Sequence, residues 1–326
     1  MSKNYTRRKS RFPKVLLLLL VLALLAVATY RFLPGLDNGA PPDQESPQEV
    51  STEPQTPAQT ITTSTGILCR LTDVGEDAVY QGDLILVNNK IPFHFPENQE
   101  ESLLCVLENK TRDYIVRDGT VLLQPAALDA LNRMMADFKA LGYDSRTVNV
   151  VAGHRTAEFQ QHLFDQGTER NGLDHAERFI AHPGGSEHHT GYALDFDILL
   201  KGGAHKEYDG KGDYAWINQN CQKYGFVVRF AKEKMEFTGI DEEAWHFRYV
   251  GVPHATLMVE KNLCLEEYID YLREIPVDGE HLSVMCEDGT YEIWYCPAGE
   301  VYVPADLDYT LSGNNVDGVI VTVQVG

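Results

Sequence analysis

Two stretches of the sequence contain the residue types that bind a metal ion and use it for hydrolysis. Residues 186–195 contain two histidines and end in an aspartate, and residues 243–246 begin with a glutamate and end in a histidine. A catalytic zinc ion takes about three protein ligands from His, Asp and Glu and leaves a further position open for water. The metal lowers the pKa of that water toward neutrality, so that it becomes a nucleophile. The two stretches therefore suggest metal-assisted hydrolysis.

One assignment of roles satisfies this chemistry. His188, Asp195 and His246 supply the ligands. Glu243 supplies a carboxylate that accepts a proton from the water and passes it to the leaving amine. Asp195 lies in an otherwise apolar stretch, where an unpaired carboxylate is costly to bury. A bound metal ion would compensate that charge.

Three neighbouring residues compete for the same roles. His189 is a rival ligand, although only one of two adjacent histidines is expected to face the metal. Asp197 shares a strand face with Asp195, because side chains alternate along a strand, so it is a second candidate ligand or a partner of one. Glu242 competes with Glu243 as the base, and spacing alone does not decide between them. Loosely spaced histidines and acids are not specific to metal sites. The alternative that these residues are ordinary polar side chains that bind no metal therefore stays open.

The two motifs resemble the signature of the VanY-type D-alanyl-D-alanine carboxypeptidases. The pattern Ser-x-His-x-x-Gly-x-Ala-x-Asp occurs at residues 186–195, and Glu-x-Trp-His follows at residues 243–246. A third match, Gly-His-Arg-Thr at residues 153–156, is similar to a Gly-Tyr-Arg-Ser segment of the family. The resemblance spans residues 115–275. The family belongs to a group of zinc metallopeptidases that includes lysostaphin-type peptidases, D-Ala-D-Ala dipeptidases and hedgehog-like proteins.

The resemblance implies a role for each matched residue. One Zn²⁺ ion would be bound by two histidines and an aspartate, with a glutamate as the general base and an arginine that stabilises the anionic intermediate. The implied residues are His188, Asp195 and His246 for zinc, Glu243 and Arg155 for catalysis, and Ser186, Gln160 and Arg155 for substrate binding.

The charge of the chain restricts its partners. The formal net charge is −20 at pH 7, and every charged residue before residue 33 is basic, so the acidic excess lies in the remainder. This negative field repels nucleic acid, which is therefore not an expected partner. A carboxypeptidase must nevertheless hold the C-terminal carboxylate of its substrate. The guanidinium of Arg155 suits either that carboxylate or an oxyanion.

The N-terminal residues predict a membrane anchor. A basic segment ends at Lys14, and residues 15–30 are apolar and uncharged. This arrangement is typical of a single-pass signal anchor whose basic end stays in the cytoplasm. The alternative is a cleaved signal peptide with its small-residue site at residues 26–28. We expect residues 1–36 to form the tail and anchor, residues 15–32 to contact the cell membrane, and the catalytic domain to be extracellular.

Composition and periodicity divide the remainder into three parts. Residues 37–65 are rich in Pro, Gln, Glu, Ser and Thr and predict a disordered linker. Residues 66–280 predict an α+β domain, with helices packed against a mostly antiparallel sheet that carries the zinc site. Residues 281–326 predict a small β-rich C-terminal extension, which either packs against the domain or acts as a binding element.

Local signals place the expected helices and strands. Pro125 suits the first turn of a helix that carries one apolar stripe and that Gly142 ends, and Thr156 suits the N-cap of a second helix over residues 157–166. A third expected helix spans residues 213–224. The expected strands are residues 84–87, 148–151, 192–199, 226–230 and 245–250.

The six cysteines raise the possibility of disulfides, because export places them in an oxidising compartment. None belongs to a Cys-x-x-Cys pair, so a thiolate zinc site is not expected. Asp288 and Gly289 predict a two-residue hairpin turn that places Cys286 opposite Tyr291. That register separates Cys286 and Cys296 too far along the ladder for a disulfide.

The sequence thus predicts a zinc D,D-carboxypeptidase that removes the terminal D-alanine from peptidoglycan stem peptides at the cell surface. An L,D-carboxypeptidase and a wall endopeptidase are alternatives that use the same zinc chemistry. A non-catalytic wall-binding module is the alternative from another class. Glu243 argues against such a module, because binding alone needs no general base.

Overall fold

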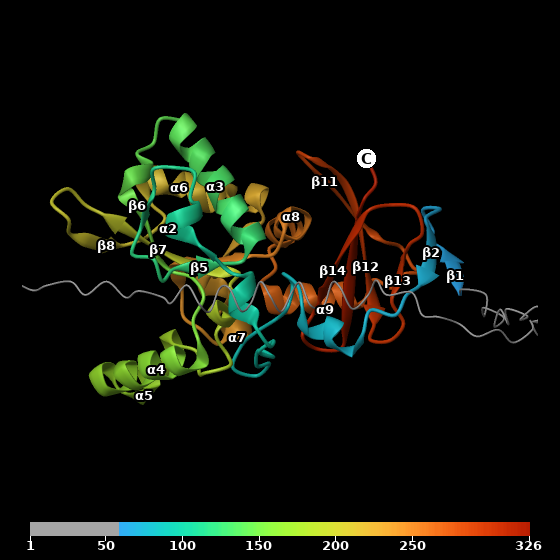
Figure 1. Cartoon of the computed structure of the whole chain (residues 1–326), viewed down its shortest axis with the longest axis horizontal. Helices are drawn as coiled ribbons and strands as arrows, with labels where there is room; N and C mark the ends of the chain where they lie inside the picture. Colours follow the sequence, from blue (N-terminus) through green and yellow to red (C-terminus); the bar gives the residue numbers. More distant parts are fainter. Residues whose placement is uncertain (1–58) are drawn as a thin grey trace, which may run out of the picture. The chain divides into compact units, whose positions relative to one another are not determined.

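The computed structural model describes residues 59–326 of the chain. The expected anchor and most of the expected linker lie outside these residues. Within them, no helix combines the length and the apolar character needed to cross a bilayer. Helices and sheets both contribute to the described part, as Figure 1 shows.

A six-stranded sheet forms the centre of the domain. Its strands run in the order β4 (Ile115–Val116), β6 (Val148–Ala152), β7 (Ala193–Leu199), β10 (Glu243–Tyr249) and β9 (Phe226–Phe230), and β8 (His205–Glu207) pairs with β7. Of these pairs only β4–β6 is parallel. The predicted combination of helices with a mostly antiparallel sheet is confirmed, and four of the expected strands lie within one or two residues of their predicted positions.

Helix α3 (Pro125–Ala140) covers one face of the sheet with its predicted apolar stripe. Phe138 lies in the same buried cluster as Phe196 of β7 and Phe247 of β10. Pro125 occupies the first turn, where its missing N–H costs nothing. Gly142 follows the helix with a φ of 95°, a left-handed conformation that glycine adopts without strain.

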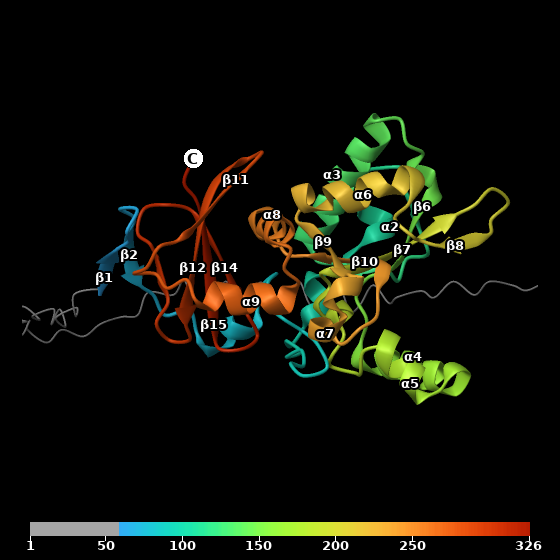
Figure 2. The ribbon, with the colours of Figure 1, turned by 180° about the vertical axis from the view of Figure 1, so that it is seen from behind.

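Three further helices follow along the chain. Thr156 caps α4 (Ala157–Asn171), as predicted, because its side chain accepts a hydrogen bond from the backbone N–H of Phe159. Helix α5 (Leu173–Phe179) follows α4, and the two lie together at one edge of the molecule in Figures 1 and 2. The helix expected over residues 213–224 is instead α6 (Ala215–Asn220), with short 3₁₀ turns on either side.

Shorter elements connect these layers. Strand β3 (Leu104–Cys105) pairs with β5 (Leu122–Leu123) in a separate two-stranded sheet. The short helices are α2 (Val106–Asn109), α7 (Met235–Thr238) and the 3₁₀ turns η1 (Glu76–Tyr80), η2 (Gln99–Ser102), η3 (Ser145–Thr147), η4 (Glu187–Thr190), η5 (Gly212–Tyr214), η6 (Cys221–Tyr224) and η7 (Lys232–Lys234).

The C-terminal residues form a four-stranded antiparallel sheet in the order β11 (Leu282–Cys286), β12 (Gly289–Pro297), β15 (Gly318–Gln324) and β14 (Tyr309–Gly313). A second sheet joins β13 (Tyr302–Pro304) to β2 (Leu68–Leu71) and β1 (Thr60–Thr62). Residues from both ends of the described chain therefore build this β-rich region. The disordered linker expected over residues 37–65 must end before β1 begins.

Helices α8 (Val252–Lys261) and α9 (Leu265–Arg273) lie between the central sheet and the C-terminal sheet, as Figure 2 shows. One buried apolar cluster contains Leu257 of α8, Ile269 of α9, Ile293 of β12 and Val227 of β9. Burial of a shared apolar surface stabilises both sides of such a contact. The C-terminal extension thus packs against the catalytic region through these helices.

Two local predictions are wrong. Residues 84–87 are buried but form no strand. Leu86 donates to the backbone carbonyl of Asn314, while Arg248 donates to the carbonyl of Ile85 and Asn315 donates to that of Leu86. The hairpin turn lies at Glu287 and Asp288, so Cys286 pairs with Gly289 two positions from the expected register. All six thiols are free.

Candidate functional site

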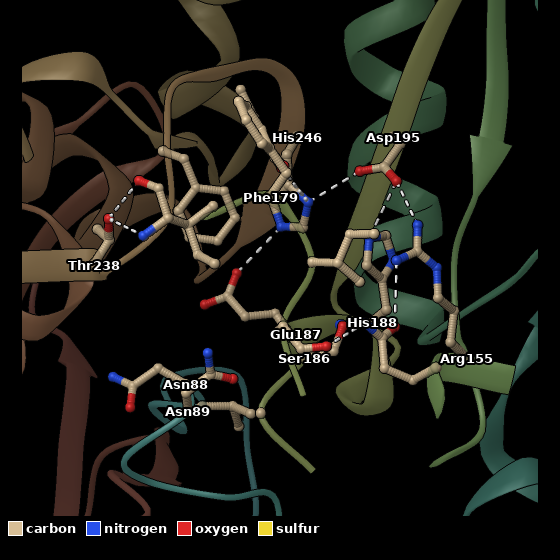
Figure 3. A pocket seen from close by; sticks show the side chains of 18 of the residues that line it. Asn88, Asn89, Arg155, Phe179, Ser186, Glu187, His188, Asp195, Thr238 and His246 are labelled. Carbon is tan, nitrogen blue, oxygen red and sulfur yellow. Dashed lines mark hydrogen bonds and ion pairs between the residues drawn. The ribbon is translucent and has the colours of Figure 1, made fainter. Parts of the chain in front are cut away.

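Strand pairing brings two of the predicted ligands together. Asp195 on β7 lies directly opposite His246 on β10, and His188 comes from η4, the turn that precedes β7. The candidate ligand atoms of these three buried residues all lie within 4.8 Å of one another. We call His188, Asp195 and His246 the metal cluster; Figure 3 shows their side chains converging.

His188 presents its Nε2 atom to the cluster. Its ring donates from Nδ1 to the carbonyl of Gly153 at 2.7 Å, which leaves Nε2 3.2 Å from Oδ2 of Asp195. Gly153 suits this position because a Cβ atom there would lie 2.3 Å from the carbonyl oxygen of Leu122. Burial, assisted by the charge of Arg155, lowers the pKa of His188 to about 4, so the ring is neutral and able to act as a ligand.

His246 presents the opposite ring nitrogen. Its Nδ1 atom lies 3.0 Å from Oδ1 of Asp195, and its Nε2 atom lies 3.4 Å from Oε2 of Glu187. Burial alone would lower the pKa of His246, but the neighbouring carboxylates of Asp195 and Glu187 outweigh burial and raise it to about 9. His246 therefore lies between two carboxylates, and both raise its pKa.

The cluster suits a cation. Asp195 is 8% exposed, and its Oδ1 atom has no hydrogen-bond donor although it lies close to His246. Burial alone would raise the pKa of Asp195, but His188, His246 and Arg155 hold it well below its usual range, so the carboxylate is ionised. A buried, ionised oxygen beside two imidazole nitrogens matches the His and carboxylate ligands that zinc accepts.

Glu243 and Arg155 flank the metal cluster. Glu243 is buried, with Oε2 3.8 Å from Nδ1 of His246, and burial raises its pKa to about 8. Arg155 donates from Nη2 to Oδ2 of Asp195 at 2.7 Å. Strongly perturbed carboxyl groups in a cleft are typical of catalytic sites.

The structure separates the rival candidates from the cluster. His189 donates from Nδ1 to the carbonyl of Arg155 and accepts at Nε2 from the N–H of Gly184, so both ring nitrogens are used elsewhere. Asp197 accepts from Asn149 and pairs with His205, away from the ligand atoms. Glu242 is exposed, whereas Glu243 is buried in the cavity wall.

A cavity of about 280 Å³ opens over the metal cluster. Gln160 lines it, donates to the carbonyl of Ala181 and accepts from Arg155 at 3.5 Å. Ser186 lines it as well, and its hydroxyl accepts a hydrogen bond from the backbone N–H of His188 at 3.4 Å. The structure thus brings every predicted site residue into one cavity. Figure 3 labels Arg155, Ser186 and the three residues of the metal cluster among them.

Sequence reasoning missed several residues of this cavity, among them the polar residues Asn88, Asn89 and Glu187. The two asparagines lie in a turn directly after residues 84–87, and no motif singles them out. Glu187 carried one weak signal, its place inside the first motif beside His188. Its contact with His246 joins positions 59 residues apart, and no local pattern reports such a contact.

Comparisons with known proteins agree with this geometry. The model of the VanY family, described as D-alanyl-D-alanine carboxypeptidase, matches residues 120–252. A D-alanyl-D-alanine carboxypeptidase of Enterococcus faecium is 35% identical over 262 residues, which cover 78% of each chain. The bifunctional D-Ala-D-Ala dipeptidase and carboxypeptidase VanXYC of Enterococcus gallinarum is 35% identical over 162 residues, covering 48% of this chain and 82% of that protein.

A solved structure is similar over a larger part of the chain. The vancomycin resistance D,D-dipeptidase VanXYg, crystallised with a D-Ala-D-Ala phosphinate analog, superposes with a TM-score of 0.69 at 28% identity. The match covers 79% of this chain and 99% of that one. It therefore extends beyond the residues that the family model matches.

Proposed function

The chain belongs to the VanY family of D-alanyl-D-alanine carboxypeptidases, and from this we propose that it is a zinc enzyme that removes the terminal D-alanine from peptidoglycan stem peptides. The observation that carries the proposal is the convergence of the metal cluster, Glu243 and Arg155 on one cavity. Those groups are a ligand set, a base and a cation, which together are what metal-assisted peptide hydrolysis requires.

The metal cluster provides the atoms that would hold one zinc ion. The ligands would be Nε2 of His188, Nδ1 of His246 and the carboxylate of Asp195. Zinc supplies a Lewis acid that polarises the scissile carbonyl and lowers the pKa of a water molecule. His188 is already neutral and oriented for this role by its hydrogen bond to Gly153.

Glu243 acts as the general base. It accepts the proton of the attacking water and then donates it to the nitrogen of the departing D-alanine. Its buried position on β10, three residues from His246, places it beside the cluster without using it as a ligand. A divalent cation nearby favours the ionised form of a carboxyl group, which offsets the effect of burial on the pKa of Glu243.

Arg155 holds negative charge on the substrate. Its guanidinium lines the cavity beside Asp195, where it suits the oxyanion that develops on the carbonyl or the C-terminal carboxylate of the peptide. Gln160 and Ser186 line the same cavity, where they would contact the substrate. Removing Arg155 should therefore affect KM, kcat or both.

Mass spectrometry of two synthetic stem peptides tests the proposed activity. The purified ectodomain with zinc should convert a pentapeptide ending in D-Ala-D-Ala to the tetrapeptide and free D-alanine, and should leave a tetrapeptide ending in a single D-alanine intact. Cleavage of the tetrapeptide alone would establish the L,D-carboxypeptidase instead. A third substrate of two cross-linked stems tests the endopeptidase, which would cleave it and neither linear peptide.

We also propose that the enzyme is tethered to the cell membrane with its catalytic domain outside. The support is the basic segment up to Lys14 followed by the uncharged apolar residues 15–30, which lie outside the described part of the structure. N-terminal sequencing of the protein from membranes tests the anchor. A mature chain that begins just after residue 28 would identify a cleaved signal peptide instead.

A further inference from the structure

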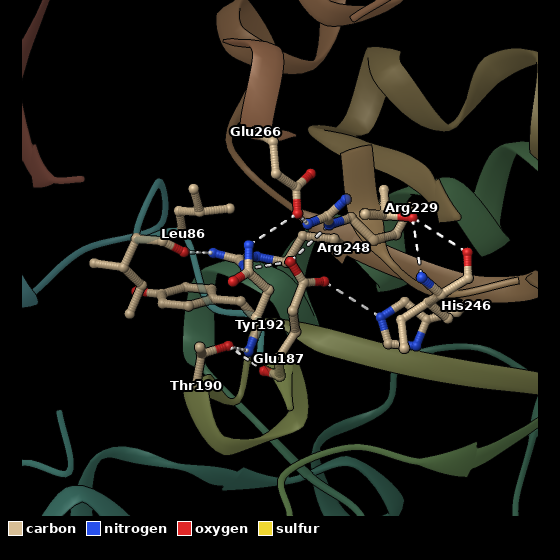
Figure 4. A network of polar contacts seen from close by, with 12 residues as sticks. Leu86, Glu187, Thr190, Tyr192, Arg229, His246, Arg248 and Glu266 are labelled. Carbon is tan, nitrogen blue, oxygen red and sulfur yellow. Dashed lines mark hydrogen bonds and ion pairs between the residues drawn. The ribbon is translucent and has the colours of Figure 1, made fainter. Parts of the chain in front are cut away.

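A second carboxylate, Glu187, lies on the side of His246 that faces away from the metal cluster. Glu187 is the residue before His188 in η4, yet its side chain points toward His246 (Figure 4). Glu187 is 3% exposed, and its Oε2 accepts a hydrogen bond from Nε2 of His246 at 3.4 Å. The proposed reaction gives Glu187 no part, although a buried carboxylate is costly to retain without one.

The two oxygens of Glu187 have different partners. Oε1 accepts from Nε of Arg229 at 2.7 Å and from Nη1 of Arg248 at 3.0 Å. Both arginines are almost completely buried. Two cations on Oε1 fix the carboxylate in place and leave Oε2 directed at His246. Figure 4 shows this division of the two oxygens.

Both arginines are themselves held by distant parts of the chain. Arg229 donates from Nη2 to Glu266 of α9 at 2.7 Å. Arg248 donates to the carbonyls of Asp83 and Ile85. We call Glu187, Arg229, Arg248 and Glu266 the arginine network. Its anchors at Asp83, Ile85 and Glu266 lie outside residues 120–252, the part that the family model matches.

We propose that Glu187 is a positioning residue that holds the ring proton of His246 on Nε2 and so reserves Nδ1 for the metal. The inference rests on the proposed zinc site. An imidazole that binds a metal through one nitrogen carries its proton on the other, and a carboxylate beside that proton fixes both the tautomer and the ring orientation. The arginine network keeps the carboxylate rigid enough to do this.

Glu187→Gln tests the proposal, because an amide reverses the hydrogen bond. The amide oxygen must stay against Arg229 and Arg248, since an NH₂ group there would face only donors. The amide NH₂ then faces Nε2 of His246, where it opposes the proton that metal binding requires. Zinc affinity, measured by competition with a chelator, should fall by about 10–100-fold. Wild-type affinity in this variant overturns the proposal.

Two further variants separate positioning from general damage to the network. Glu266→Gln removes a carboxylate from Arg229 without touching His246, so its zinc affinity should stay within about twofold of wild type. Loss of a residue that hydrogen-bonds to a zinc ligand should instead lower the affinity by about 10–100-fold. An equal loss in Glu266→Gln overturns the proposal. Glu187→Asp keeps the charge against the arginines but withdraws from His246 by one methylene. It should fold and bind zinc more weakly, and it carries the test if Glu187→Gln does not fold.

The protonated nitrogen can also be observed directly. In the zinc-loaded wild type, long-range ¹H–¹⁵N correlation of the histidine side chains should show His246 with a proton on Nε2 and none on Nδ1. The reverse pattern overturns the proposal. If the wild type neither binds zinc nor cleaves the pentapeptide, the proposed function fails; if it does both and Glu187→Gln binds zinc equally well, only the role of Glu187 fails.

Discussion

The metal cluster and the arginine network meet at His246 and differ in how their buried carboxylates are paired. In the arginine network, Glu187 faces two guanidinium groups, and these hold its pKa well below the usual range against the effect of burial, which alone would raise it. In the metal cluster, Oδ1 of Asp195 has no hydrogen-bond donor, and Glu243 beside it has a raised pKa. Both oxygens of Glu187 thus have hydrogen-bond donors, whereas only one oxygen of Asp195 has a donor.

This difference in pairing suggests that the arginine network serves stability and the metal cluster serves catalysis. A buried ion pair is destabilising to break by removing one partner, because the charge of the remaining partner is left uncompensated. An uncompensated group costs stability, and such groups persist mainly where they serve function. We therefore expect substitutions in the metal cluster and at Glu243 to remove zinc or activity while the fold survives. Substitutions of the buried arginines should instead weaken the fold.

The largest effect should come from removing a ligand. His246→Ala deletes one of the three ligand residues, so zinc content, measured by mass spectrometry of the metal, should fall from one ion per chain to almost none, and peptide hydrolysis should be lost. His205→Ala is the matched control, because His205 pairs with Asp197 at the surface. This variant should keep its full zinc content. Full zinc content in His246→Ala would contradict the ligand assignment.

Glu243→Gln should separate chemistry from binding. The amide keeps the shape of the side chain but accepts no proton at neutral pH, so kcat should fall by about 10²–10⁴-fold. KM and zinc content should change little, because the base acts mainly in the transition state.

Glu242→Gln is the control for this variant, since that carboxylate is exposed and should be dispensable. An inactive Glu242→Gln beside an active Glu243→Gln would show that the base is misassigned by one residue. Normal hydrolysis by both would rule out a carboxylate base in this strand.

Arg248→Met should test the other side of His246. The variant leaves Glu187 with one guanidinium instead of two and removes the donor to the buried carbonyls of Asp83 and Ile85. The free energy of unfolding in urea should fall by about 3–5 kcal/mol. Arg133→Met is the control, because Arg133 forms an exposed pair with Asp129 and should change stability by less than about 0.5 kcal/mol. Equal losses in both would remove the distinction between the two regions.

The smallest effect should be a gain in the stability of metal-free Glu243→Gln that depends on pH. In the metal-free protein the folded-state pKa of Glu243 is raised to about 8 from its ordinary value of 4.5. Its contribution to stability is therefore complete below pH 4.5 and is lost as the pH rises through 8. Glu243→Gln removes this loss, so its Tm with chelator should exceed that of the wild type by a few degrees at pH 9 and equal it at pH 4.

Glu242→Gln again serves as the control and should show no such pH dependence, because its carboxylate is exposed. A Tm difference between Glu243→Gln and the wild type that stays constant from pH 4 to pH 9 would contradict the burial of Glu243.

Several features followed from the sequence because they depend on neighbouring residues. The apolar stripe of α3, its start at Pro125 and its end before Gly142 are set by helix periodicity and backbone preferences, and the structure confirms them. The motif at residues 186–195 likewise identified His188 and Asp195 as candidates through their spacing. Spacing by itself left His189, Asp197 and Glu242 open, and resemblance to a family made the choice among them.

Only the tertiary structure decided what those side chains face. His189 forms hydrogen bonds with the backbone of Arg155 and Gly184. Asp197 accepts a hydrogen bond from Asn149 and pairs with His205. A local sequence pattern does not report such contacts. The pairing of β1 and β2 with β13 and the contact of Glu187 with His246 are of the same kind. Residues 84–87 look like a strand by hydrophobicity alone, yet Arg248 and Asn315 satisfy their carbonyls instead. Hydrogen-bond partners are selected by the packing of the whole chain, because a buried polar group takes whichever partner the fold brings within reach.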